Sequence, residues 1–201
     1  AAIRGAAELL QDDLPEADRA VFAGQIEQQV QRIQRLIDRL LELSKLEQRQ
    51  SLLVDAPTSL RDCAEAAIAE AQARARQKNV AITLQGDGAS GPFEAALVAL
   101  AIGNLLDNAI DFSPAGGTIR VELVGSLITV TDAGPGVPDY ALPRLGERFF
   151  STPRPNGERT GSGLGLAIVR QIMALHHGTL HLANRDRAAG PGLRAELVFP
   201  A

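Results

Sequence analysis

The sequence predicts an α+β protein in which a helical hairpin is followed by a separate domain of strands and helices. Residues 1–50 show helical spacing of apolar residues and almost no strand pattern. Beyond about residue 58, short segments of alternating apolar and polar residues lie between further helical segments. This order is typical of one sheet covered by a helical layer, an α/β sandwich.

Residues 1–50 are predicted to form an antiparallel helical hairpin that dimerises. Apolar residues recur at spacings of four and three, the a/d rhythm of a coiled coil: Ile26, Val30, Ile33, Ile37 and Leu40. Further leucines widen this stripe: Leu36, Leu41, Leu43 and Leu46. Because two helices cannot bury so wide a face, we expect two chains to form a four-helix bundle. The alternative is that one chain folds the hairpin against its own second domain.

Residues 51–58 are predicted to be a linker, and residues 59–201 a second domain. Pro57 breaks the helical pattern, and Thr58 or Ser59 can cap a helix that runs to about residue 78. Two later helices are expected near 94–112 and 165–176, and strands are expected at 80–85, 117–124, 127–134, 178–184 and 193–200.

Composition excludes several functions. The net charge of -4, without a basic cluster, argues against binding nucleic acid. The single Cys63 can form no internal disulfide and complete no cysteine metal site, so a reducing, cytoplasmic setting is expected. No apolar run approaches the roughly 18 residues that cross a bilayer, and the chain does not start like a signal peptide.

The helical segment "GNLLDNAIDFS" carries polar residues on one face. At about 100° per residue, Asn104, Asn108 and Asp111 share this face, with Asp107 beside them. The face is either a plain solvated surface, or a set of oxygen ligands that completes the shell of Mg²⁺ together with phosphate and water.

The segment "LITVTDAGPGVP" ends an apolar strand on a carboxylate. Asp132 continues the strand face and precedes Gly134 and Gly136. The carboxylate can accept a hydrogen bond from an exocyclic amine while the glycines let a flat ring approach, or the segment is an ordinary Asp-Gly turn.

The segment "GSGLGL" leads into the last helix. It is neither a Walker loop nor a Rossmann fingerprint, but Gly161, Gly163 and Gly165 precede a helix start, where amide groups favour an anion. The polar segment before it is expected to be a mobile lid that carries Arg154 and Arg159 towards phosphates.

The order of these motifs resembles the ATP-binding domain of sensor histidine kinases, Hsp90, MutL and type II topoisomerases, with its N, G1, F and G2 boxes. The helical hairpin in front is similar to the dimerisation and phosphotransfer domain of sensor histidine kinases. Within that family, "AAIRGAAELL", "GNLLDNAIDFSP" and "SGLGLAIV" resemble CreC-type sensor kinases. The resemblance covers nearly the whole chain.

The resemblance implies an ATP site with Mg²⁺. It makes Asn108 the Mg²⁺ ligand and places Asn104 in the same nucleotide site, while Asp132 holds the adenine amino group beside Gly134 and Gly136. The remaining implied nucleotide-binding positions are Asp111, the F-box pair Phe149 and Phe150, the lid residues Arg154 and Arg159, and the phosphate-side hinge Gly161, Gly163, Leu164 and Gly165.

The chain departs from the family pattern in two ways. Asp111 and Phe112 stand where most members have Lys-Tyr, so compensating charge is expected from Mg²⁺ or from Arg154 or Arg159. Residues 1–175 contain no histidine, and the phosphoacceptor histidine is expected about two helical turns before Ala1. His176 and His177 stand at a helix end, where they are expected to have capping or cationic roles.

The implied activity is transfer of the ATP γ-phosphoryl group to a histidine, and then to an aspartate in the receiver domain of a response regulator. The implied setting is a homodimer joined through residues 1–50, on the cytoplasmic side of an inner-membrane sensor protein. The fragment alone is not expected to autophosphorylate. One alternative is a non-catalytic nucleotide-sensing dimerisation module. Another is an anti-sigma serine kinase, which fits the ATP-binding motifs but not the long helical hairpin in front of them.

Overall fold

The computed structural model describes residues 15–153, 161–186 and 190–200, which fall into two compact units, 1–42 and 43–201. The first arm of the predicted hairpin lies outside the described residues. Its second arm belongs to helix α2 (Glu16–Gln48). The predicted seam is about half exposed on α2, as Val30 at 53% and Ile37 at 46% show. The four-helix bundle remains a prediction.

The second unit contains a five-stranded sheet. Its strands are β2 (Ala81–Gly88), β4 (Thr118–Gly125), β5 (Leu127–Thr131), β7 (Leu193–Val198) and β6 (Thr179–Asn184), in this spatial order. Only the β2–β4 pair is parallel within this sheet. All five expected strands are therefore present. A small sheet of β1 (Thr58–Ser59) and β3 (Ser90–Gly91) was not foreseen.

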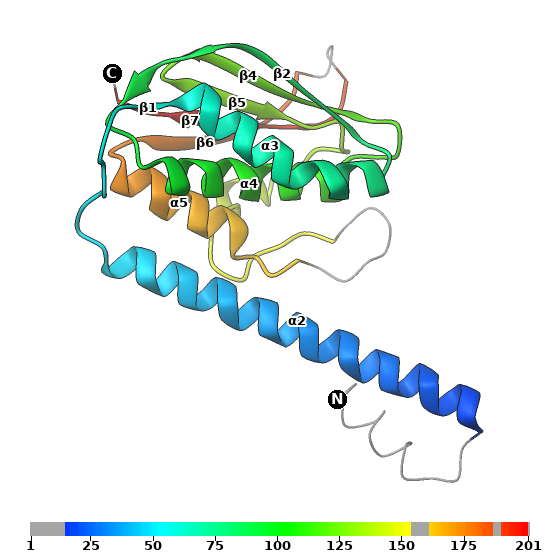
Figure 1. Cartoon of the computed structure of the whole chain (residues 1–201). Helices are drawn as coiled ribbons and strands as arrows, with labels where there is room; N and C mark the ends of the chain where they lie inside the picture. Colours follow the sequence, from blue (N-terminus) through cyan, green and yellow to red (C-terminus); the bar gives the residue numbers. More distant parts are fainter. Residues whose placement is uncertain (1–14, 154–160, 187–189, 201) are drawn as a thin grey trace. The chain divides into compact units, whose positions relative to one another are not determined.

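Three helices cover one face of the sheet: α3 (Leu60–Gln77), α4 (Ala95–Phe112) and α5 (Gly165–Leu175) (Figure 1). A single turn of 3-10 helix, η1 (Leu142–Arg144), lies between β5 and α5 in the chain. The side-chain alternation of β4 explains the layering, because Ile119, Val121 and Leu123 are buried while their neighbours are exposed. The helix-covered face therefore forms the core, and the α+β class is confirmed.

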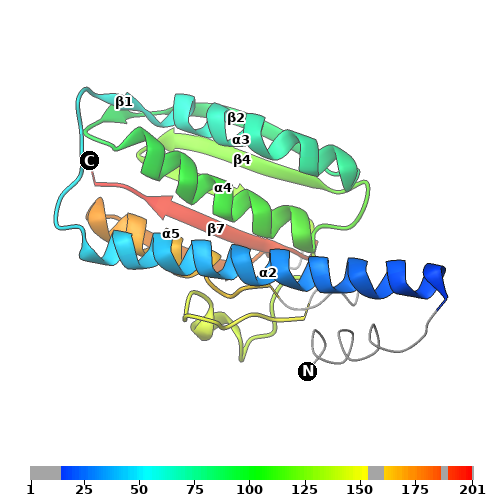
Figure 2. The ribbon, with the colours of Figure 1, turned by 60° about the horizontal axis from the view of Figure 1, so that its bottom comes forward.

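Helix α4 is the central helix of this layer and packs against both α3 and α5 (Figure 2). Its 18 residues have a mean hydropathy of 1.4, which by length and composition alone is enough to cross a membrane. This corrects the sequence-based statement that no apolar segment approaches that length. Leu106 and Ile110 are fully buried, so the apolar side chains of α4 form part of the hydrophobic core.

Candidate active site

The directions of α4 and α5 bring two of the predicted motifs to one end of the helical layer. The backbone N–H of Glu94, the N-cap of α4, donates to Nε2 of His176, the C-cap of α5, at 3.2 Å. The two helices pack together, and because the start of α4 meets the end of α5 they run in opposite directions. Since the 11 residues of α5 span about 16 Å, Gly165 at its start lies alongside the half of α4 that contains Asn104.

The two asparagines of α4 are only partly engaged. Asn104 is 7% exposed, and its Nδ2 donates to the Leu100 carbonyl at 2.9 Å. Asn108 is half-buried, and its amide has no hydrogen bond within the described residues. Because amides near the interior are normally hydrogen-bonded, both side-chain oxygens are suited to an additional ligand.

Asp111 is engaged by cations from α3. Arg74 donates from Nη1 to Asp107 Oδ1 at 2.6 Å and from Nη2 to Asp111 Oδ1. Lys78 Nζ donates to the Asp111 carbonyl at 2.9 Å. Sequence reasoning sought the compensating charge in Mg²⁺ or the lid arginines, and it missed this source because α3 lies more than thirty residues earlier in the chain.

Asp132 follows β5 and is 7% exposed. Its Oδ1 accepts the backbone N–H of Gly134 at 2.8 Å and that of Leu193 at 3.0 Å. Within the described residues Oδ2 accepts no hydrogen bond. Burial raises the pKa of this carboxyl above its ordinary 3.8, and the two N–H donors and Arg185 oppose the shift. The site thus presents a buried acceptor oxygen.

The glycines after Asp132 are needed for packing. A Cβ on Gly134 would lie 2.8 Å from the Phe112 carbonyl oxygen, so this turn presses against the end of α4. Gly136 has φ +78°, and a Cβ there would lie 2.9 Å from Asn184 Oδ1. Asn184 in turn binds the backbone of Val137 through both amide atoms, at 2.8 and 2.7 Å. Asn184 supports this loop, and sequence reasoning missed it because it resembles an ordinary strand end.

The F-box and glycine-rich segments meet at Phe149 and Gly163. Phe149 donates its N–H to the Gly163 carbonyl at 3.0 Å, and Phe149 itself has φ +62°. A Cβ on Gly163 would lie 2.5 Å from the Phe149 carbonyl carbon. Ser151 Oγ donates to the Gly161 carbonyl at 3.3 Å, which joins the same two segments again. Arg154 and Arg159 lie outside the described residues.

The glycine-rich segment ends at a helix start without a side-chain cap. Leu164 is fully buried as the N-cap of α5, and Gly165 is its first residue. The N–H of Leu164 donates to Ser162 Oγ at 3.3 Å. Within the described residues, no acceptor receives the N–H groups of Gly165 and Leu166, which follow it. Such groups, with the positive end of the helix dipole, attract anions.

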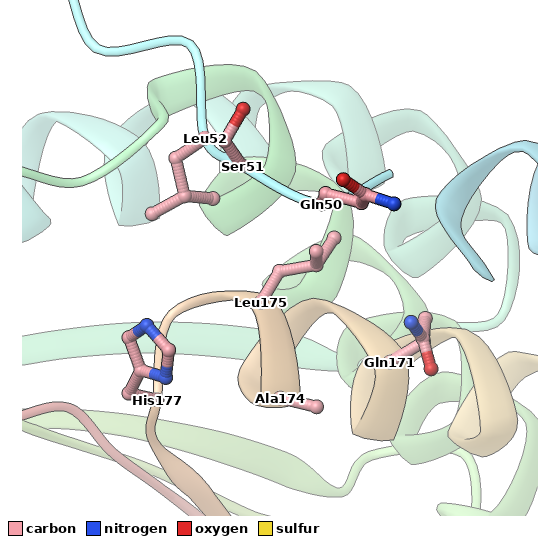
Figure 3. Close-up of a pocket in the computed structure, with 7 residues that line it drawn as sticks. All are labelled: Gln50, Ser51, Leu52, Gln171, Ala174, Leu175 and His177. Atoms are coloured by element: carbon pink, nitrogen blue, oxygen red, sulfur yellow. The ribbon is translucent and has the colours of Figure 1, made fainter. Parts of the chain in front are cut away.

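Glu94, the N-cap of α4, holds the segment that follows α2. Both Glu94 carboxylate oxygens accept from Arg49, at 2.9 and 2.8 Å, and one also accepts the Leu53 N–H at 2.8 Å. A cleft of about 370 Å³ lies between the linker and α5 (Figure 3), lined by Gln50, Ser51, Leu52, Gln171, Ala174, Leu175 and His177. None of the predicted site residues lines this cleft.

Comparisons with known proteins identify the family of the chain. Residues 94–201 match the family described as histidine kinase-, DNA gyrase B-, and HSP90-like ATPase, and residues 1–49 match the His Kinase A (phospho-acceptor) domain. The chain is 40% identical over 191 residues to the sensor protein CreC of Escherichia coli K12, covering 92% of this chain and 39% of CreC. It is 37% identical over 181 residues to the sensor protein QseC of Escherichia coli O157:H7, covering 89% of this chain and 39% of QseC.

A solved structure supports the fold. The cytoplasmic segment of histidine kinase QseC aligns with a TM-score of 0.58 and 27% identity, covering 85% of this chain and 94% of that one. The chain spans 39% of the length of its curated relatives CreC and QseC. With a His Kinase A region followed by the matching ATPase domain, the chain belongs to the sensor histidine kinase family.

Proposed function

We propose that this chain binds Mg-ATP and serves as the kinase core of a two-component sensor. The observation that carries the proposal is the buried Asp132 carboxylate, which has one oxygen held by two backbone N–H groups and the other directed to no donor among the described residues. A buried acceptor of this kind is suited to a neutral donor such as the adenine 6-amino group.

The metal and the phosphates have separate candidate partners. Asn108 would hold Mg²⁺ through its amide oxygen, and its lack of a hydrogen-bond partner within the described residues fits that role. Mg²⁺ supplies neutralisation of phosphate charge when it is bound. The N-terminal amides of α5, together with Gly161 and Gly163, are suited to the phosphate end of the nucleotide.

In the intact kinase, the ATP γ-phosphoryl group would be transferred to a histidine preceding Ala1, and then to an aspartate of a response-regulator receiver domain. The acceptor imidazole has to lie in line with the bond that breaks, so the chain's contribution is positioning and charge stabilisation. The homodimer through residues 1–50 and the membrane-anchored parent, with this region on its cytoplasmic side, belong to the same proposal. The match of residues 1–49 to the phospho-acceptor domain supports it.

Replacement of Asp132 by asparagine tests the adenine assignment. The substituted amide retains an oxygen for the Gly134 and Leu193 N–H groups, but it presents an NH₂ donor in place of Oδ2. The wild type should bind Mg-ATP at least about tenfold more tightly than Mg-ITP, whose base has a 6-oxo group. Asp132→Asn should abolish or reverse this preference, whereas Asp139→Asn, an exposed control, should keep it.

Titration calorimetry measures the affinities of each protein for both nucleotides. A wild type that binds neither nucleotide contradicts the proposed function as a whole. A wild-type preference for ATP that survives in Asp132→Asn contradicts only the role of Asp132.

A further inference from the structure

Arg74 joins two carboxylates on the face of α4 that carries the asparagines. Asp107 and Asp111 are four residues apart, so their side chains are neighbours on the helix, and like charges at this spacing repel. Arg74 binds one oxygen of each, with Nη1 at 2.6 Å from Asp107 Oδ1. The planar guanidinium therefore bridges the pair and fixes both carboxylates in one arrangement.

The packing of α3 on α4 makes this bridge possible. Ala67, Ala71 and Ala75 are buried at intervals of four residues along α3. Small side chains allow close approach of the two helices, which places Arg74 within reach of α4 although its own side chain remains 41% exposed. Asp111 is much less accessible, with 7% of its side chain exposed, so its charge requires a partner.

A second cation, Lys78 at the C-cap of α3, reaches the same end of α4. Lys78 Nζ donates to the carbonyl oxygens of Asp111 at 2.9 Å and of Ile110 at 3.4 Å. These carbonyls belong to the last turn of α4, where the helix dipole is negative. Arg74 thus lies against the two carboxylates and Lys78 against the last carbonyls of α4. Asn108 is within one helical turn of both Asp107 and Asp111.

We infer that Arg74 is a positioning residue of the nucleotide site, which holds Asp107 and Asp111 and sets the charge that the polyphosphate meets beside Asn108. This inference rests on the proposed function. Asp111 stands where most family members have a lysine. Arg74, from α3, supplies a positive charge beside this position.

The charge of the ligand separates this role from a structural one. Arg74→Ala removes one positive charge near the phosphates and leaves the adenine contact at Asp132 intact. The substitution should lower the affinity for Mg-ATP about tenfold at low salt and by a smaller factor at high salt. The affinity for adenosine should change by less than about twofold. Arg74→Lys should recover part of the loss, because it keeps the charge without the bridge.

Two further variants control for folding. Arg76→Ala removes an exposed arginine from the same helix and should leave both affinities unchanged. Asp107→Asn/Asp111→Asn keeps Arg74 and removes two negative charges, so it should bind Mg-ATP more tightly than the wild type and adenosine equally well. This opposite direction keeps the inference testable even if Arg74→Ala fails to fold.

Titration of the whole chain with Mg-ATP and with adenosine decides the outcome. If Arg74→Ala loses equal affinity for Mg-ATP and for adenosine, Arg74 has a structural role and the inference is wrong. The inference is also wrong if Mg-ATP affinity is unchanged in both Arg74→Ala and the doubly substituted aspartate variant. A wild type that binds neither ligand would overturn the proposed function and this inference together.

Discussion

His176 accepts a hydrogen bond from the backbone N–H of Glu94 and links the start of α4 to the end of α5. Its Nδ1 lies 2.8 Å from the Ile172 carbonyl oxygen, so a neutral ring protonated at Nδ1 satisfies both partners. A second proton, on Nε2, would face the Glu94 N–H. The histidine is thus a structural residue, packed edge-on against Phe199 with ring centroids 5.6 Å apart.

Stability should therefore fall in mildly acidic solution. Burial lowers the pKa of His176 below its ordinary 6.5, although the Ile172 carbonyl and Glu94 raise it, while Arg49 and His177 lower it further. The unfolded chain binds a proton near pH 6.5 and the folded chain does not, so the stabilisation is present above that pH. It is lost as the pH falls towards the folded pKa, at up to about 1.4 kcal/mol per pH unit.

Denaturant unfolding at pH 7.5 and pH 5.5 measures this difference. His176→Gln should show a smaller pH dependence than the wild type, and His181→Gln, which alters an exposed residue of β6, should match the wild type. Equal pH dependence in all three proteins would contradict the assignment.

The Arg49–Glu94 pair should stabilise the linker. Burial raises the pKa of Glu94, but hydrogen bonds from Arg49 and the Leu53 N–H more than offset this and hold the pKa below its ordinary 4.5. Arg49→Ala should lower the free energy of unfolding by about 1.5–3 kcal/mol, since Glu94 is only 12% exposed. It should also speed hydrogen exchange at the Leu53 amide.

The exposed Arg61–Glu65 pair provides the comparison. Glu65→Ala should change the free energy of unfolding by less than about 1 kcal/mol, because both side chains are solvated. Equal effects of Arg49→Ala and Glu65→Ala would show that the linker pair is an ordinary surface contact.

Gly163→Ala should disrupt the junction of the F-box and glycine-rich segments. Gly163 has φ +67°, and an added Cβ would lie 2.5–2.7 Å from the backbone of Phe149 and Phe150. Gly116 has φ +82° but open space around its Cβ position, so Gly116→Ala isolates the backbone cost, about 1–2 kcal/mol. Thermal unfolding should show a larger loss for Gly163→Ala, and an equal loss would exclude the steric contribution.

Much of this fold could be predicted because it depends on local patterns. The alternation at Ile119, Val121 and Leu123 and the Ser59 cap are visible within a few residues of sequence, and the Ser59 hydroxyl indeed accepts the Asp62 N–H at 3.3 Å. The order of the motifs also indicated the family, which the family matches confirm, whereas the assignment of the site to these motifs stays a prediction.

The supporting contacts could not be predicted, because they join residues distant in the chain. Arg74 reaches Asp111 across 37 positions and Asn184 reaches Val137 across 47. Nothing in the segment around Arg74 or Asn184 distinguishes either residue from an ordinary surface arginine or asparagine. Their roles follow only from the packing of α3 on α4 and of β6 beside the loop after β5.

The effect of Mg²⁺ on ATP affinity, measured by calorimetry in wild type and in Asn108→Ala, tests the proposed nucleotide site most directly. Mg²⁺ should tighten ATP binding by at least about tenfold in the wild type and by less than about twofold in Asn108→Ala, with unchanged affinity in the absence of metal. Asn108→Asp, which retains an oxygen ligand, should keep the metal effect. A full Mg²⁺ effect in Asn108→Ala would contradict the account.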